Sequence, residues 1–182
     1  MLRTLVASVL LVGGLSSILV AQELRPRRTP SVTMADPAVT TVTRGKSGTV
    51  QLDFRITSGF HVNSNKPSSP LLIPTALKLT APTDIVVGRT TYPPGEERSF
   101  PFSPNEKLSV YGGPFSIKVS MRPLVSVVPG KYAVHGTLRY QACDNATCYP
   151  PKELPVDFQI RVVKNAAENV HRNPAQCPHA HR

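Results

Sequence analysis

The feature that most constrains the fold of this chain is an alternation of apolar and polar residues with a period of two. Four segments show it, at residues 50–56, 115–121, 132–140 and 156–162. Successive side chains of a β-strand point to opposite faces, so each segment is predicted to be a strand with one buried face. Nineteen prolines and eleven glycines interrupt the chain at short intervals, as turns between short strands do.

No segment beyond the amino terminus sustains the helical period of 3.6 residues. Strands without helices predict an all-β fold, namely an antiparallel β-sandwich of immunoglobulin-like type, with a small barrel as the alternative. The sandwich is expected to span residues 39–164, with a flexible lead-in at 22–38 and a disordered tail at 165–182. A length of 182 residues suits one such domain, and the absence of tryptophan excludes an antibody-type core.

Residues 1–21 are predicted to be a secretory signal peptide. Arg3 provides a short positive region, an uncharged run follows from Thr4 to Ala21, and small residues lie late in that run. A retained membrane anchor is the competing interpretation, because the run is only slightly shorter than the about 20 apolar residues that a spanning helix needs. After cleavage the protein is expected to be soluble and monomeric, either periplasmic or secreted, where disulfides form and persist.

A net charge of +10 raises the question of nucleic-acid or membrane-surface binding. The basic residues are spread along the chain, apart from a cluster at Arg25, Arg27 and Arg28 in a proline-containing segment. No basic helix and no aromatic RNA-binding signature accompanies them, so no nucleic-acid partner is predicted. For the proline-rich segment at residues 91–104, a solvated connector is favoured over a binding loop.

Two of the three cysteines, Cys143 and Cys148, stand close together in the stretch YQACDNATCYPP. Asp144 and Asn145 favour a turn, which can bring the two Cα atoms within the about 4.4–6.8 Å that a disulfide requires. A structural bridge across so short a loop contributes about 2 kcal/mol in the chain-entropy model. Tyr149 and the two prolines after it stiffen the exit, and a rigid, exposed disulfide suits thiol exchange. From these residues alone, both interpretations stay open.

The same stretch resembles the family of the amino-terminal domain of the bacterial thiol–disulfide interchange protein DsbD. The alternating strand before it, the stretch LPVDFQIRVV after it and the upstream stretch FRITSGFHVNSNKP are also similar, so the resemblance covers residues 49–163. It implies an immunoglobulin-like sandwich outside the cytoplasm. Its two cysteines would receive electrons from a membrane-embedded domain by way of a thioredoxin-like domain, and would reduce disulfides in exported client proteins.

The resemblance assigns Cys143 and Cys148 as a catalytic redox pair and favours Cys148 for the mixed disulfide with a partner. No segment resembles the family's transmembrane or thioredoxin-like domains, so a membrane electron donor is expected to be a separate protein. The partners implied are thioredoxin-like or other thiol–disulfide proteins. The predicted function is an exported thiol–disulfide interchange domain, either an oxidoreductase or an electron-transfer domain. The alternative is a non-enzymatic β-sandwich binding module with a structural disulfide.

The resemblance also suggests which residues surround the redox pair. In the family a cap loop shields the cysteines with an aromatic residue; Phe102 is the candidate here, with Pro104 as the alternative. His61 and Asn63 stand where some members have tyrosines near the site. Tyr149, directly after the second cysteine, is a further candidate neighbour.

The stretch CPHAHR near the carboxyl terminus contains three side chains that bind metals, Cys177, His179 and His181. Three ligands within five residues, with a proline between them, make a poor closed site. Neither a metal nor another cofactor is therefore predicted. Cys177 would remain an unpaired thiol that is able to form an intermolecular bridge.

Overall fold

The computed structural model describes residues 29–164, which form twelve strands in three four-stranded sheets. The first sheet consists, in spatial order, of β1 (Val32–Met34), β3 (Gly48–Ile56), β9 (Pro114–Pro123) and β6 (Ile85–Thr91). The second consists of β2 (Thr40–Thr43), β12 (Lys152–Val163), β10 (Gly130–Tyr140) and β5 (Ala76–Thr80). The third consists of β11 (Ala142–Cys143), β4 (His61–Asn63), β8 (Ser103–Gly112) and β7 (Glu96–Phe100).

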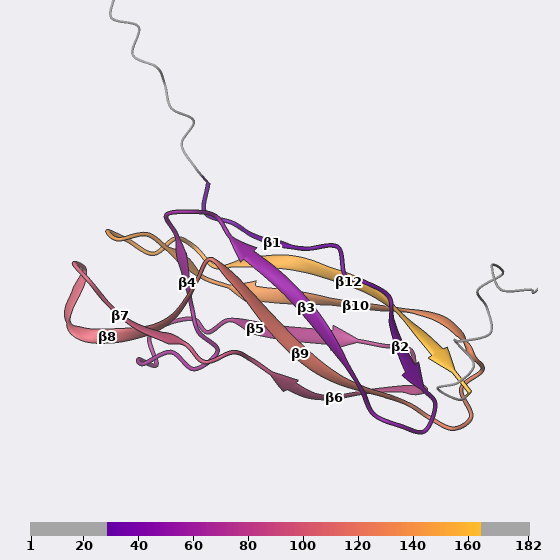
Figure 1. Cartoon of the computed structure of the whole chain (residues 1–182). Helices are drawn as coiled ribbons and strands as arrows, with labels where there is room; N and C mark the ends of the chain where they lie inside the picture. Colours follow the sequence, from indigo (N-terminus) through magenta and orange to yellow (C-terminus); the bar gives the residue numbers. More distant parts are fainter. Residues whose placement is uncertain (1–28, 165–182) are drawn as a thin grey trace, which may run out of the picture.

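The first two sheets pack face to face as an immunoglobulin-like β-sandwich, and the third sheet extends from one end (Figure 1). Among the described strand pairs only β12 and β2 run parallel, and the others are antiparallel. The predicted all-β sandwich is therefore confirmed. Within residues 29–164, no helix is long and apolar enough to cross a membrane.

The core lies between the first and second sheets, and the alternating segments supply it. Because every second side chain of a strand points inward, β3, β9, β10 and β12 each contribute a row of apolar residues. The largest fully buried ones on these strands are Val50, Leu52, Ile117, Val119, Met121, Val134, Leu138, Val156 and Ile160. Phe54 and Phe115 stack across the first sheet with their ring centroids 5.3 Å apart.

The ordered fold begins earlier than the predicted residue 39. Val32 is buried and pairs with Ile56, so β1 forms the edge of the first sheet. The hydroxyl group of Tyr140 also accepts a hydrogen bond from the backbone N–H of Val32, at 3.2 Å. The segment predicted as a lead-in, residues 22–38, therefore contains a strand. The sequence did not reveal this strand because three residues are too few to show a period of two. Residues 1–28 and 165–182, with the predicted signal peptide and tail, lie outside the described part.

The segment at residues 91–104, interpreted as a connector, contains β7 and the start of β8. The two strands form a hairpin in which Arg98 lies opposite Leu108. The first four residues of β7 are exposed and only Phe100 is buried, because β7 is an edge strand. A strand with polar residues on both faces shows no alternation in the sequence, and the segment is thus a paired hairpin instead of a solvated connector.

A substitution at Gly136 tests the close contact between β10 and β5. Gly136 lies opposite Leu79, and a Cβ atom there would overlap the carbonyl oxygen of Lys78. Because this neighbour is backbone and moves only with its strand, Gly136→Ala is expected to lower the free energy of unfolding by about 1–3 kcal/mol in urea titrations. Gly130→Ala is the control, since its Cβ would have no neighbour closer than 3.8 Å. Equal stabilities for the two variants would contradict the packing described.

Candidate functional site

The two cysteines predicted as a redox pair form a disulfide, with an S–S distance of 2.04 Å and a Cα–Cα distance of 4.0 Å. Their loop connects β10, which ends at Tyr140, to β12, which begins at Lys152. Within this loop the chain leaves the second sheet and forms β11, which pairs with β4 of the third sheet. This pairing places Cys143 directly opposite His61. The disulfide therefore lies where the second and third sheets meet.

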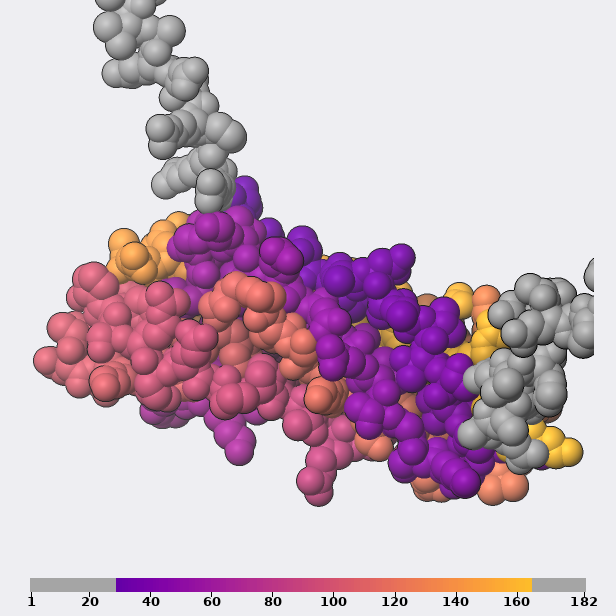
Figure 2. All heavy atoms as spheres, in the orientation of Figure 1, coloured from indigo at the N-terminus to yellow at the C-terminus, as the bar shows by residue number. Residues whose placement is uncertain are grey.

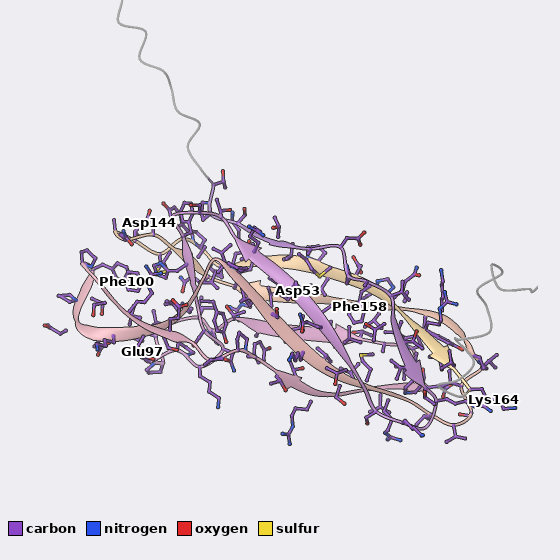
Figure 3. All side chains as sticks on the ribbon, viewed as in Figure 1. Asp53, Glu97, Phe100, Asp144, Phe158 and Lys164 are labelled. Atoms are coloured by element: carbon purple, nitrogen blue, oxygen red, sulfur yellow. A yellow bond between two sulfur atoms is a disulfide. The ribbon has the colours of Figure 1, made fainter. Side chains whose placement is uncertain are left out.

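The disulfide lies at the end of the sandwich that the β7–β8 hairpin also forms. Figure 3 shows Asp144 of the disulfide loop and Phe100 of the hairpin at this end, with Lys164 at the opposite end. In the space-filling view, the loop, drawn in orange, lies beside the hairpin, drawn in pink (Figure 2). The site is thus built from the third sheet and the loop, at one end of the sandwich formed by the first two sheets.

The two bonded cysteines differ in their access to solvent. Cys143 lies in β11, paired with β4, and has an exposed fraction of 0%. Cys148 follows the turn and is partly exposed. A reagent that approaches from solvent therefore meets Cys148 first.

Asp144 organises the turn between the cysteines. Its Oδ1 accepts hydrogen bonds from the backbone N–H groups of Ala146 and Thr147, at 2.8 and 2.9 Å, and its Oδ2 accepts one from the Tyr149 hydroxyl group at 2.7 Å. These bonds, that of Tyr149 above all, hold the pKa of the Asp144 carboxyl below its usual value. The backbone closes the turn further, since Tyr149 N–H donates to the Ala142 carbonyl at 2.9 Å.

A chain of side-chain amides ties the exit of the loop to β4. Asn63 donates from Nδ2 to the Ile73 carbonyl at 3.0 Å and to Gln141 Oε1 at 3.2 Å. Gln141 in turn donates from Nε2 to the Tyr149 carbonyl at 3.2 Å. Asn63, predicted to lie near the site, therefore contributes to it through Gln141, a residue that the sequence analysis did not identify.

His61 is the buried polar residue nearest to Cys143 along the sheet. Its exposed fraction is 2%, and its ring stacks on Phe100 with centroids 4.0 Å apart. Burial, helped by the positive charge of Arg98 and opposed by Asp144, lowers the pKa of His61 from 6.5 to about 4. The Nε2 atom is buried and has no hydrogen-bond partner among the described residues.

The structure places Phe102, the predicted cap, on the outside of an aromatic stack. Phe102 is 38% exposed and stacks on Phe100 at a centroid distance of 5.3 Å, whereas Phe100 is 3% exposed and contacts His61. Pro104, the alternative cap, is exposed. The two phenylalanines flank one proline in the sequence, and the pattern alone does not say which ring points inward.

Two surface hollows flank the site. The larger one, about 990 Å³, is mainly apolar and is lined by Phe60, Tyr149 and the two prolines that follow it, together with Thr29 and Pro30. The second, about 720 Å³, is lined by His61, Glu96, Arg98 and others. Phe60 borders both, and its ring meets the Tyr149 ring edge to face at 5.8 Å. Tyr149, a predicted neighbour, thus belongs to the site, while Phe60 was not identified from the sequence.

Residues 29–164 contain no group of three or more His, Cys, Asp or Glu side chains that could hold a metal ion. The candidate ligands Cys177, His179 and His181 lie outside the described residues.

The comparison with protein-family models identifies a family for this chain. A family model described as "Thiol:disulfide interchange protein DsbD, N-terminal" matches residues 29–159. The solved DsbD N-terminal domain of Neisseria meningitidis in the reduced form is 24% identical, with a TM-score of 0.36, over 71% of this chain and 82% of that chain. A complex of the DsbD and PilB N-terminal domains from the same organism gives 24% identity and a TM-score of 0.39, over 60% and 73%. No curated protein matches the chain.

The lowered pKa of His61 predicts how stability depends on pH. The unfolded chain takes up a proton on this side chain near pH 6.5, whereas the folded protein does so only near pH 4. The free energy of unfolding is therefore expected to fall as the pH decreases from about 6.5 to about 4. His61→Gln removes this contribution and should flatten the profile in urea titrations. The control is His135→Gln, at an exposed histidine of β10 that pairs with Asp157, and it should not flatten the profile. A slope that survives in His61→Gln would contradict the assignment.

Tyr149→Phe tests the hydrogen bonds of the disulfide loop. Removal of the hydroxyl group takes away the strongest cause of the lowered Asp144 pKa, so this pKa is expected to rise. The backbone N–H groups of Ala146 and Thr147 remain, so the pKa should stay below that of a solvated aspartate. NMR titration of the Asp144 carboxyl carbon measures both values, with Tyr132→Phe as the control on β10. An unchanged Asp144 pKa would count against the described contact.

Proposed function

Because the chain belongs to the family of the amino-terminal domain of the thiol:disulfide interchange protein DsbD, we propose that it is an exported domain that passes reducing equivalents to or from partner proteins. Cys143 and Cys148 are the groups that carry the electrons. The observation that carries this proposal is the unequal exposure of the two bonded cysteines. Thiol exchange requires that an incoming thiolate reach one of the two sulfurs. The partial exposure of Cys148, against the complete burial of Cys143, supports attack at Cys148.

The exchange proceeds in two balanced steps. A partner thiolate attacks Cys148 Sγ, a bond forms between these two sulfurs, and the Cys143–Cys148 bond breaks with its electron pair on Cys143 Sγ. A second thiolate of the partner then attacks the partner's own sulfur in the mixed disulfide, and Cys148 leaves as a thiolate. The pair of the domain is then reduced and the partner holds a disulfide. The same steps in reverse deliver the electrons to an oxidised client.

The loop has the non-covalent support that such a cycle requires. The three hydrogen bonds to the Asp144 carboxylate and the bond from Tyr149 N–H to the Ala142 carbonyl do not involve sulfur. These contacts can therefore persist when the disulfide opens. In the chain-entropy model, a disulfide across so short a loop adds only about 2 kcal/mol to the free energy of unfolding. The hydrogen bonds just described already hold the same loop. This arrangement favours exchange over the structural interpretation.

The surface beside Cys148 suits a protein partner with a dithiol, such as a thioredoxin-like domain. The larger hollow is lined by Phe60, Tyr149 and the two prolines after it, so apolar surface begins at the residue that follows Cys148. Residues 1–21 would direct the chain out of the cytoplasm, where the pair can cycle, and the electrons would come from a membrane donor, as the family resemblance implies.

The reduction potential of the pair tests the proposal. It is measured in Cys177→Ser by equilibration with glutathione, because removal of the third thiol prevents scrambling. An exchanging pair is expected between about −270 and −120 mV, the span of known carriers. A potential below about −300 mV, typical of structural disulfides, would overturn the proposal.

Single-cysteine variants test the direction of attack. In the Cys177→Ser background, Cys143→Ser leaves the partly exposed Cys148 and Cys148→Ser leaves the buried Cys143. The first variant is expected to form a mixed disulfide with oxidised glutathione at least about tenfold faster, because access controls the rate. Both variants unfolded in urea provide the control and should react similarly. Equal rates in the folded variants would contradict the assigned role of Cys148.

A further inference from the structure

The exchange described above leaves the buried imidazole of His61 without a role. The register of β4 and β11 places His61 opposite Cys143, so the two side chains project from the same face of the third sheet. In the oxidised protein Nε2 of this imidazole is buried and has no hydrogen-bond partner within residues 29–164. A buried polar atom without a partner loses the hydrogen bond that water would give it, which makes such atoms rare in folded proteins.

We propose that His61 is a positioning residue whose Nε2 becomes the hydrogen-bond partner of the Cys143 sulfur when the disulfide opens. The inference rests on the proposed exchange, in which Cys143 is the sulfur released. A disulfide sulfur carries no proton, whereas the released sulfur is a thiolate or, after protonation, a thiol. Neutral imidazole serves both, because Nε2 accepts a bond from the thiol in one tautomer and its N–H donates to the thiolate in the other. Reduction therefore satisfies Nε2 and stabilises the dithiol state.

The His61 imidazole is buried, and stacking against Phe100 fixes its position. Phe100 stacks on the ring at 4.0 Å with an interplanar angle of 16°, and Phe102 covers Phe100 in turn. Because Nε2 is buried, a hydrogen bond from it to sulfur does not compete with water, and its effect on the thiol is larger than it would be at the surface.

Four charged groups lie around this imidazole. The Arg98 guanidinium lowers the pKa of His61 and the Asp144 carboxylate raises it, while Glu96 and Arg55 line the same hollow. Burial has the largest effect, and the imidazole is therefore neutral at pH 7. A neutral His61 adds no charge to the site, so its influence on the cysteines is exerted through the hydrogen bond.

The experiment compares reduction potentials in the full chain with Cys177→Ser. His61→Phe keeps a ring to stack on Phe100 but has no nitrogen, and His61→Gln restores an amide near the position of Nε2. His61→Phe is expected to lower the equilibrium constant for reduction by glutathione about tenfold, which corresponds to about 30 mV. His61→Gln should stay within about threefold of the parent, and His135→Gln, on an exposed part of β10, should be unchanged.

An unchanged constant in His61→Phe would overturn the inference, and so would equal decreases in His61→Phe and His61→Gln, which would indicate a packing effect. The ¹⁵N chemical shift of His61 Nε2 in the parent protein is a second measurement that needs no variant. It should change on reduction of the disulfide, and a constant shift would overturn the inference even if His61→Phe does not fold. If the parent potential lies below the range of carriers, the proposed exchange fails, while the difference between His61→Phe and the parent still decides the role of His61.

Discussion

The structure depends on the antiparallel pairing of β10 with β12, which runs without a shift from Gly130 opposite Val162 to Tyr140 opposite Lys152. This hairpin forms the centre of the second sheet, between β5 and β2, and its inward side chains fill one half of the core. The disulfide loop is simply the connection between its two strands. The two bonded cysteines thus follow the end of an extensively paired part of the molecule, and the pairing of β10 with β12 does not involve their bond.

The third sheet places buried polar groups beside this rigid hairpin. The two buried atoms without hydrogen-bond partners in the described structure, His61 Nε2 and Asn63 Oδ1, both belong to β4. The two residues are two positions apart in the strand, so their side chains point to the same face, which Cys143 also occupies. Two buried polar atoms without hydrogen-bond partners lower the free energy of unfolding, and both lie at the site. Proteins commonly concentrate such departures where they act chemically.

The sequence predicted the central strands well, because β3, β9, β10 and β12 each have one face in the core and alternate along most of their length. It failed at the edges, where β1 has only three residues and β7 is polar on both faces. The cysteine pair was evident from local spacing. The contacts around it were not, because the stacking of His61 on Phe100 joins residues far apart in the chain, and only the hairpin geometry decides that Phe100 lies inward.

The two ends of the described chain lie in very different places with respect to the disulfide. Pro30 lines the larger hollow beside Tyr149, and its carbonyl accepts a hydrogen bond from Lys152 Nζ at 2.9 Å. Lys164 lies at the far end of the sandwich (Figure 3). A tether or label joined just before residue 29 would therefore lie on the side of the disulfide loop, whereas one joined after residue 164 would lie away from it. Surface immobilisation of the domain for binding measurements should use the carboxyl-terminal side.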